Sequence, residues 1–472
     1  MRLIPIYTWN KGLRNFDVRR KAFSQQPWAQ GVILLACVVV AMLLANLPFT
    51  KHLYHEVLNT TFTLHLGSPD GSLHLDIPKG MTIEGFINDV LMVVFFFTVG
   101  LEIRREVAYG ELSSPKKAMM PIIAAFGGVI APALIFTAIN HGTAASSGWG
   151  IPTATDIAFA VCILSVLGDK VPVSLKVFLT ALAIADDLIA ILVVALFYGG
   201  QIKLGLLGIA LLVILLTLVL RRLGEKSMFP YLFLAAIVWI LFYYSGIHAT
   251  MSGVVMAFLI PATPRYNESQ FKHKWMKYER RLHVFGEVPD PAFPTGPQRH
   301  CLRRLRDIGA GSMTMTDRVE HALSPWVNFL IMPIFALANA GVEIADPSYF
   351  NVFRFDPAMG SVSMGIFLGL LLGKPIGITL TSWIAIKLKV GEMPAKATWP
   401  MFFAVACLGG IGFTMSIFVD TLSFGDQAPE VMSRLRDMGK IAVLMGSICA
   451  GILGTILVNL VYGLQNRKNT DK

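Results

Sequence analysis

The chain has 472 residues, of which 54% are hydrophobic and only 15% are charged, and its mean hydropathy is +0.61. A soluble globular protein carries roughly 25% charged residues, and a single soluble core stops growing well short of this length. Runs of about 20 mainly apolar residues, long enough to cross a bilayer, recur along the sequence. The composition therefore excludes a soluble catalytic domain and predicts an all-α polytopic membrane protein.

Twelve apolar segments predict transmembrane helices. The first eight lie within residues 29–261 and the last four within 319–464, with a polar insert at 262–318 between them and short ends at 1–28 and 465–472. The seventh and eighth spans are joined by only a few residues, so the count depends on that junction. The spans are expected near 29–48, 85–103, 118–138, 152–168, 174–198, 203–221, 229–245, 247–261, 325–342, 361–387, 399–421 and 438–463.

Basic residues recur in alternate loops, which predicts the orientation of the chain. By the positive-inside rule the loops rich in Lys and Arg are cytoplasmic, so both termini are cytoplasmic and the number of spans is even. The net charge of +10 then reflects topology and contact with anionic lipids instead of nucleic-acid binding. The basic residues that begin this pattern are Lys11, Arg14, Arg19, Arg20 and Lys21.

Neither the insert at 262–318 nor the cysteines predict a catalytic or metal-binding site. The insert at 262–318 is rich in Pro, Gly and Arg, and it predicts a flexible cytoplasmic loop with one short basic amphipathic helix. A regulatory or partner-docking role is the alternative. The scattered cysteines predict neither a disulfide framework nor a metal cluster; they are Cys37, Cys162, Cys301, Cys407 and Cys449.

Ionisable side chains inside the predicted spans are the main functional candidates, because each is costly at bilayer depth. They are Asp89, Asp156, Asp186, Asp187 and Lys374. The excess of acids over bases is typical of a cation pathway. Asp89 lies near the end of its span, where capping a neighbouring helix explains it equally well, whereas one structural role does not need two adjacent acids.

The adjacent acids are Asp186 and Asp187 in ALAIADDLIAIL, residues 181–192. Neighbours on an α-helix point about 100° apart, so both can reach one cavity while facing different directions. Sodium, like other hard cations, prefers carboxylate, hydroxyl and carbonyl oxygens. Such a site holds either protons or a cation but not both fully, and this competition is the minimum machinery for exchange.

Two predicted spans contain residues that interrupt helices. One opens with Ile151 and Pro152 and is short, and the other holds a glycine cluster; glycine costs about 1 kcal/mol in a helix interior. Clustered glycines alone are more typical of close helix packing. Interrupted spans in corresponding halves instead indicate an inverted-repeat transporter, here with copies near 118–198 and 361–463. The residues of these interruptions are Thr155 and Asp156 in the first, and Gly409, Gly410, Gly412 and Thr414 in the second.

The segment at 48–82 predicts a β-hairpin outside the membrane. Two short alternating runs, TFTLHL and SLHLDI, are separated by the turn-like GSPDG. Such a hairpin is a candidate interface between two copies of the chain.

Five segments together resemble the NhaA family of sodium/proton antiporters. They are FFFTVGLEIRRE, TATDIAFA, ALAIADDL, GKPIGI and GGIGFTMSIF, in this order along the predicted spans. Each segment alone is a weak signal, but five in order are specific. The resemblance runs from about residue 28 to 464 and leaves out the 262–318 insert, in which this chain departs from the family pattern.

The resemblance implies roles for individual residues. Asp186 and Asp187 would bind the cation and protons, with Asp187 the firmer cation ligand, and Lys374 would pair with Asp186. Thr155 and Asp156 would lie where the unwound segments cross. A pH-responsive group would comprise Glu102, Arg105, Glu106, His248, Glu320 and His321. Taken by themselves, Glu102 and Arg105 predict only a surface ion pair, and His248 an interfacial residue at a helix start.

The resemblance also implies the function. It is secondary exchange of sodium or lithium for protons across the bacterial cytoplasmic membrane by alternating access, electrogenic and pH-regulated, in a homodimer without enzymatic activity or a cofactor. No phosphate-binding loop for ATP is present, since GLLLGKP lacks the required spacing and the following Ser or Thr. A passive or differently coupled cation channel is the alternative, although paired broken helices favour alternating access over a pore. An intramembrane aspartyl protease is disfavoured, because its GxGD pattern is absent.

Overall fold

The computed structural model describes residues 27–67, 74–200, 202–225, 227–284, 295–344, 347–356, 359–425 and 427–470. These residues form two compact units, and each is described by itself. Unit 1 comprises Met1–Met92, Glu111–Gly200 and Val327–Lys472, and unit 2 comprises Val93–Gly110 and Gln201–Trp326. The basic residues predicted to anchor the N-terminus, from Lys11 to Lys21, lie outside the described residues.

The predicted spans are helical in the structure. Among the described residues, nine helices are long and apolar enough to cross a membrane, and two bent helix pairs raise this number to eleven. The predicted span at 247–261 corresponds to the shorter apolar helix α11, Thr250–Leu259. The prediction of an all-α polytopic membrane protein is confirmed.

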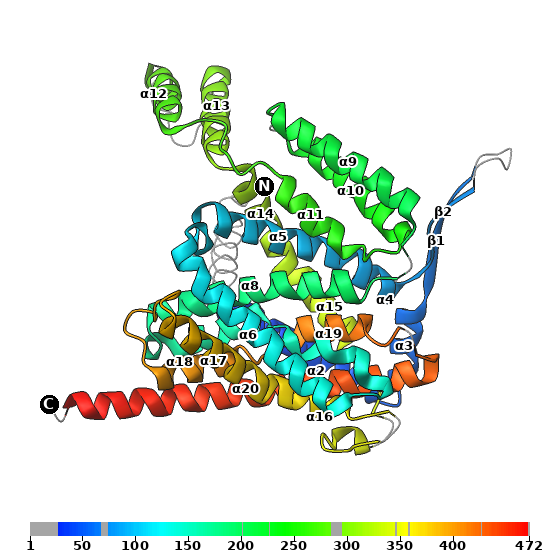
Figure 1. Cartoon of the computed structure of the whole chain (residues 1–472). Coiled ribbons are helices and arrows are strands. Elements are labelled where there is room, and N and C mark those ends of the chain that lie inside the picture. Colours follow the sequence, from blue (N-terminus) through cyan, green and yellow to red (C-terminus); the bar gives the residue numbers. More distant parts are fainter. Residues whose placement is uncertain are drawn as a thin grey trace, which may run out of the picture. The chain divides into compact units, whose positions relative to one another are not determined.

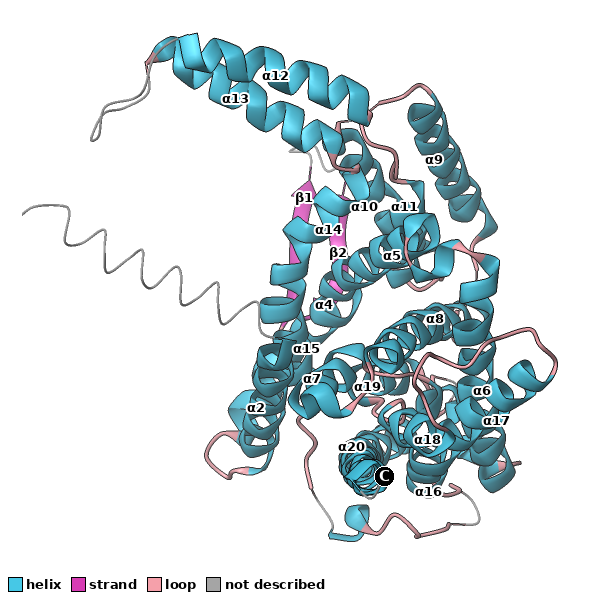
Figure 2. Ribbon diagram, turned by 90° about the vertical axis from the view of Figure 1, so that its left-hand side faces the viewer, coloured by secondary structure: helices cyan, strands magenta, loops and turns pink. Residues whose placement is uncertain are grey.

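Unit 1 contains most of the helices (Figures 1 and 2). Its α-helices are α2 (Pro27–Asn46), α3 (Lys51–Asn59), α4 (Ile83–Phe86), α6 (Pro115–Asn140), α7 (Ile157–Leu167), α8 (Val173–Phe197), α15 (Met332–Asn339), α16 (Val362–Leu368), α17 (Lys374–Lys387), α18 (Trp399–Leu408), α19 (Phe413–Leu422) and α20 (Pro429–Thr470). Short 3₁₀ helices are η2 (Glu111–Ser113), η3 (Ala144–Thr153), η4 (Gly168–Lys170) and η6 (Pro347–Phe350).

Unit 2 is formed by seven α-helices of the described chain. They are α5 (Met92–Tyr109, whose first residue belongs to unit 1), α9 (Leu204–Arg222), α10 (Met228–Ser245), α11, α12 (Glu268–Val284), α13 (Gly296–Ser312) and α14 (Met315–Trp326). Its apolar core joins α5, α9, α10, α11 and α14 through buried side chains such as Leu101, Tyr231 and Met256.

The predicted hairpin is present in unit 1. Strand β1 (Thr61–Gly67) pairs antiparallel with β2 (His74–Thr82), with Thr61 opposite Thr82 and Gly67 opposite His74 (Figure 2). A register shift between Phe62 and Leu64 marks a bulge. Most of the predicted GSPDG turn lies outside the described residues.

In the described part of the chain three spans contain a π-helical turn, and two of these turns precede a proline. They are η1 (Ile87–Leu91), η5 (Val327–Ile331) and η7 (Gly369–Gly373). Pro333 and Pro375 follow the latter two. Proline lacks a backbone N–H and its ring crowds the preceding turn, so a wider turn accommodates it without ending the span. The η7 turn ends directly before Lys374 and thereby sets where that side chain leaves the helix.

Helices α6 and α17 of unit 1 approach closely because glycines face each other. A Cβ atom on Gly377 would lie only 2.1 Å from the carbonyl oxygen of Gly127, and one on Gly373 only 2.9 Å from Pro132. A Cβ atom on Gly128 would touch the stem of Lys374 at 3.7 Å. Small residues at a helix contact let the two backbones approach, and this contact brings Lys374 into the core.

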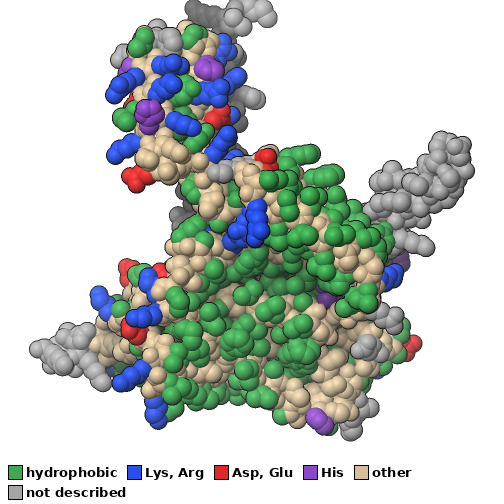
Figure 3. Space-filling model, turned by 45° about the horizontal axis from the view of Figure 1, so that its top comes forward, with side chains coloured by type: hydrophobic (Ala, Val, Ile, Leu, Met, Phe, Trp, Pro, Cys, Tyr) green, Lys and Arg blue, Asp and Glu red, His purple; other side chains and the backbone are tan. Residues whose placement is uncertain are grey.

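The insert at 262–318 has more helix than the sequence predicts. It holds the helical hairpin of α12 and α13, each of 17 residues, instead of one short helix in a flexible loop (Figures 1 and 2). Both helices are amphipathic, and α13 begins with a capping box between Thr295 and Gln298. Lys and Arg side chains gather over the hairpin in the space-filling view (Figure 3). The single-helix prediction was wrong because neither helix is apolar enough to stand out from hydropathy alone.

Apolar side chains cover much of the surface outside that hairpin (Figure 3). Helix α9, for example, exposes a run of large residues that includes Leu211, Leu212, Leu215 and Leu216. In water such a surface would drive aggregation, whereas it is the expected surface of a helix that contacts lipid.

Candidate functional site

The two interrupted spans of unit 1 are bent at their breaks. The 3₁₀ helix η3 and α7 meet at 41° across residues 154–156, and α18 and α19 meet at 49° across Gly409–Gly412. Both breaks fall where the sequence predicted unwinding. The glycines of the second break have negative φ angles where the caps are described, −63° at Gly409 and −95° at Gly412, so backbone handedness does not explain them.

Close approach explains the glycines of the second break. A Cβ atom on Gly410 would lie 2.3 Å from the carbonyl oxygen of Leu370, and one on Gly412 would lie 3.0 Å from that of Ala154. The unwound segment therefore packs directly against the backbone of η7 and of the first break. Unwinding and close packing, the two interpretations of the glycine cluster, occur together.

The two breaks are joined by hydrogen bonds. The backbone N–H of Asp156 donates to the carbonyl oxygen of Ile411 (2.6 Å), and the hydroxyl of Thr155 donates to that of Gly409 (2.8 Å). In return, the backbone N–H of Thr414 donates to Asp156 Oδ2 (3.0 Å), and its hydroxyl also donates to this oxygen. Each unwound segment thus satisfies polar backbone groups of the other, as a membrane interior requires.

Asp156 caps the amino ends of two half-helices. Its Oδ1 accepts from the backbone N–H of Phe159 in the first turn of α7 (3.2 Å), while its Oδ2 accepts from Thr414 in the first turn of α19. A carboxylate is favourable at the positive end of a helix dipole. The opposing carbonyl end of α18 receives the Thr155 hydroxyl instead. Asp156 is 2% exposed and lies between the two half-helices.

Lys374 connects the crossing to the acidic pair. Its ammonium Nζ donates to the hydroxyl of Thr155 (2.8 Å) and forms an ion pair with Asp186. Lys374 is completely buried, and Asp186 and Asp187 are 1% and 3% exposed. A buried charge is tolerated only with a partner and further hydrogen bonds, and this lysine has both. A chain of donors therefore runs from Lys374 through Thr155 to Gly409.

One contributor to the crossing escaped the sequence analysis. The hydroxyl of Ser447 on α20 accepts from the backbone N–H groups of Gly412 and Phe413, both at 3.2 Å, at the start of α19. A serine within an apolar span gives no sequence signal, because its partner lies 35 residues away. Asp420 near the end of α19 also escaped: it is fully buried, yet it stands at the edge of the predicted span 399–421.

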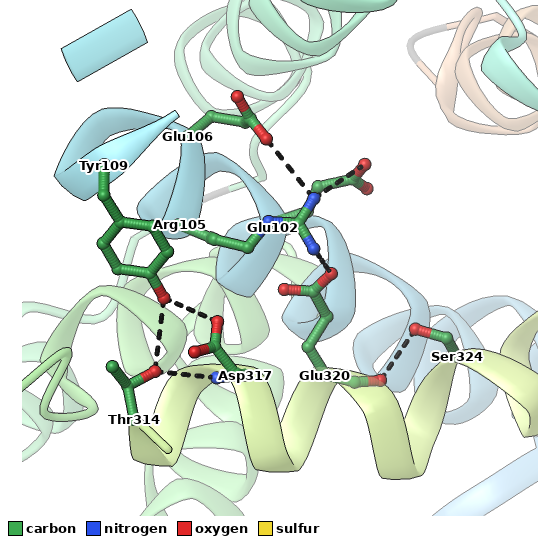
Figure 4. A network of polar contacts seen from close by, with 8 residues as sticks. All are labelled: Glu102, Arg105, Glu106, Tyr109, Thr314, Asp317, Glu320 and Ser324. Atoms are coloured by element: carbon green, nitrogen blue, oxygen red, sulfur yellow. Dashed lines mark hydrogen bonds and ion pairs between the residues drawn. The ribbon is translucent and has the colours of Figure 1, made fainter. Parts of the chain in front are cut away.

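In unit 2, four of the predicted pH-responsive residues lie together (Figure 4). Arg105 of α5 forms ion pairs with Glu320 of α14, with Glu106 (3.3 Å) and with Glu102 (3.9 Å). The side chain of Arg105 is about one-third exposed (34%). A single cation therefore holds three acids at the contact between α5 and α14.

The same contact includes polar residues that the sequence did not indicate. The hydroxyl of Tyr109 donates to Asp317 Oδ1 (2.5 Å) and shares a hydrogen bond with the Thr314 hydroxyl (3.2 Å), which in turn accepts from the backbone N–H of Asp317 (3.1 Å) (Figure 4). These bonds fix the start of α14 against α5, one turn from Glu320.

Of the three other predicted residues, His248 and Asp89 lie on other segments of their own units, and His321 directly follows Glu320. His321 is exposed on α14, and His248 lies in the connection between α10 and α11. Asp89 lies in the π-helical turn η1 of unit 1, next to Asn88, whose amide exchanges hydrogen bonds with that of Asn339 (3.1 and 2.8 Å). No group of three or more His, Cys, Asp or Glu within the described part of the chain forms a metal centre.

Burial of charge at the crossing of two broken membrane helices defines the class of protein. Discontinuous spans whose half-helix ends surround a polar site near mid-membrane are the architecture of secondary transporters. The comparisons with known proteins agree. The model of the family described as Na+/H+ antiporter 1 matches residues 21–458, and the chain belongs to this family.

Individual relatives cover nearly the whole chain. The Na(+)/H(+) antiporter NhaA of Oleidesulfovibrio alaskensis is 40% identical over 437 residues, which is 92% of this chain and 92% of that protein. Na(+)/H(+) antiporter NhaA 2 of Syntrophotalea carbinolica is 41% identical over 445 residues, 92% of this chain and 96% of that protein. NhaA of Helicobacter pylori strain HPAG1 is 39% identical over 444 residues, 94% of each. The predicted family is therefore confirmed.

Proposed function

We propose that this protein exchanges sodium or lithium for protons across the bacterial cytoplasmic membrane, and that the exchange occurs at Asp186 and Asp187. The observation that carries the proposal is the buried ion pair of Lys374 and Asp186 beside Thr155, at the crossing of two broken helices. Membership of the Na+/H+ antiporter 1 family supports the choice of ions.

The geometry supplies a physical reason for competition between the ions. A sodium ion that takes oxygens of both Asp186 and Asp187 displaces Lys374 from its carboxylate partner. A buried ammonium without a partner is strongly disfavoured, so Lys374 gives up a proton as sodium binds. Asp187 likewise releases its proton when it binds sodium, and reprotonation of Lys374 and of Asp187 then expels the ion. If each of the two residues releases one proton, more than one proton moves per sodium ion and transport is electrogenic.

The hydrogen bonds between the two breaks support alternating access. Thr155 and Asp156 hold the second break, and Thr414 holds the first, so the unwound segments are linked to each other at the site that would bind the ion. A change of charge at Asp186 reaches Thr155 through Lys374. The proposed motion is a joint shift of both crossing segments that exposes the site to one side and then to the other.

The Arg105 cluster is the proposed pH-responsive element, together with His248 and His321. Three acids around one partly exposed guanidinium change their net charge with pH, and α14 directly continues the chain from the basic α12–α13 hairpin. Regulation by pH would then occur at the Arg105 contact, and ion binding at Asp186 and Asp187.

A homodimer with both termini in the cytoplasm completes the proposal. The two-stranded hairpin of β1 and β2 pairs with no third strand among the described residues, so each strand offers a free edge. Exposed strand edges are ready templates for pairing with another chain. The proposed partner is a second copy, and crosslinking of a cysteine introduced into β1 would test it.

Reconstitution of the purified chain into proteoliposomes tests the exchange. An imposed sodium gradient should drive protons against their own gradient, and Asp187→Asn should abolish this movement while the protein remains folded. The exposed Asp169→Asn is a matched control that should exchange normally. Sodium flux without proton movement would establish a channel instead, and undiminished exchange by Asp187→Asn would remove the acidic pair from the mechanism.

A further inference from the structure

Asp420 is a buried acid that the exchange mechanism does not use. It lies in the last turn of α19 and is completely buried, and neither of its carboxylate oxygens has a hydrogen-bond partner among the described residues. Buried polar groups almost always have such partners, so an exception calls for an explanation. A carboxylate held in this state permanently would be costly, and a structural role would have supplied donors.

The packing around Asp420 leaves room for this side chain. A Cβ atom on Gly439 of α20 would lie 2.1 Å from Asp420 Oδ1, so the glycine is what allows the carboxylate to fit between α19 and α20. Three charged residues of α20 act electrostatically on the acid: Arg436, Asp437 and Lys440. All three are partly exposed. The acid is therefore enclosed by protein, whereas the charged side chains of α20 that act on it are accessible to solvent.

The end of α8 supplies a further titratable neighbour. Tyr198, which follows α8, lies close enough for the charge of Asp420 to act on it. Its hydroxyl donates to the carbonyl oxygen of Ser147 (2.8 Å) and accepts from the backbone N–H of Gly150 (3.0 Å). On the orientation predicted from the loop charges, this end of unit 1 faces the outside of the cell.

A buried polar line leads from Asp420 back to the broken-helix crossing. Ser416 lies four residues before Asp420, so both side chains are on one face of α19. The hydroxyl of Ser416 is also completely buried and without a partner among the described residues. Ser416 lies next to Gly412 in the break, since a Cβ atom on that glycine would be 2.2 Å from its hydroxyl oxygen. The six steps along α19 from Thr414 to Asp420 correspond to a rise of about 9 Å.

We propose that Asp420 is a second proton-binding residue, which takes up a proton from the outer aqueous phase and passes it along the Ser416 face of α19 toward the exchange site. Uptake converts the carboxylate to the acid, and release restores it, so no other reactant is needed. A proton suits this position better than sodium, because it needs no shell of several oxygens. The inference rests on the proposed exchange at Asp186 and Asp187.

The test compares Asp420→Asn with the unmodified protein in proteoliposomes at saturating sodium and varied outer pH. The amide keeps the shape of the side chain but cannot carry a proton. We expect the exchange rate to fall by about a hundredfold where proton transfer limits it, sodium binding measured by calorimetry to be unchanged, and Asp420→Glu to restore exchange. Infrared difference spectra between low and high pH should lose a protonated carboxyl band in Asp420→Asn.

Two further variants separate a proton site from other roles. Asp437→Asn removes the same charge next to the same cations and should leave the rate unchanged; an equal loss in this variant would show a net-charge effect and overturn the proposal. Ser416→Ala removes a hydroxyl without a partner, so it should fold normally and slow exchange in the same pH range. Unaltered exchange and spectra in Asp420→Asn would overturn the proposal, as would a loss of sodium binding.

The failure of the proposed function has a different signature. If the unmodified protein moved sodium without protons, the exchange at Asp186 and Asp187 would be refuted, whereas the infrared spectra would still report whether Asp420 binds a proton.

Discussion

Replacing Lys374 by alanine removes a cation that lies fully buried against Asp186. The substitution leaves a carboxylate that is 1% exposed without its charged partner and deprives Thr155 of a donor. Breaking a buried ion pair by truncating one member costs about 3–5 kcal/mol, because the other charge is left uncompensated. The free energy of unfolding of Lys374→Ala should fall by this amount.

The double variant Lys374→Met/Asp186→Leu should recover most of this loss. Replacing both members of a buried pair by apolar residues of similar volume is often neutral or stabilising. Equilibrium unfolding in mixed detergent–SDS micelles measures all the variants, including the single changes Lys374→Met and Asp186→Leu that close the cycle. Because each single change should destabilise the protein and the double change should not, the coupling free energy between the two positions should be well above the roughly 0.5 kcal/mol seen for independent positions.

Two results would refute this reasoning. Lys374→Ala could unfold within about 1 kcal/mol of the unmodified protein, which would mean that the pair is not desolvated as the structure has it. The effects of the single changes could also add in the double variant, which would mean that the two charges do not interact. Neither result depends on whether the protein transports ions, so stability and mechanism are tested separately.

Three other predictions follow from individual contacts. Gly410→Ala places a methyl group 2.3 Å from a backbone oxygen, so it should cost about 1–3 kcal/mol of stability and slow exchange. The control Gly208→Ala meets open space on α9 and should be neutral or stabilising. Burial raises the pKa of Tyr198 from its usual 10 to about 12. Because the tyrosine therefore loses its proton in the unfolded chain at a lower pH than in the folded protein, the free energy of unfolding should fall as pH rises above 10. Tyr198→Phe should remove that part of the decline. Arg105→Gln should change the free energy of unfolding by less than about 1 kcal/mol, since its guanidinium is partly exposed, but should shift the pH profile of exchange; an unshifted profile would separate Arg105 and Glu320 from regulation.

The sequence predicted the class of fold and the main residues of the site because those features are local. Twelve apolar runs determine membrane spans wherever the chain folds, since backbone polar groups in a bilayer must be satisfied within helices. Acids within such runs are conspicuous because few charges occur there at all. The residues at both breaks were therefore identified without a structure, and the resemblance of five segments gave Lys374 its expected partner.

The sequence did not predict contacts between residues far apart in the chain. Ser447 completes the crossing by accepting two backbone N–H groups, and Tyr109 fixes α14 against α5, but a serine in an apolar helix or a tyrosine at its end is unremarkable in sequence. For the insert at 262–318, the sequence analysis predicted too little helix. Its two helices are too polar to stand out by hydropathy and are stabilised by packing against each other.

The sequence by itself determined that this protein folds in a lipid bilayer, because it contains apolar runs long enough to cross one. It also showed that a few acids, one lysine and two helix breaks interrupt these runs. What only the tertiary structure decided is which of these groups meet. Asp156 caps both half-helices, Lys374 pairs with Asp186 and donates to Thr155, and Asp420 stands in the space left by Gly439. The physical reason is that helix propensity and hydropathy act within one segment, whereas desolvated charges and hydrogen bonds are satisfied by whichever segments the packing brings together.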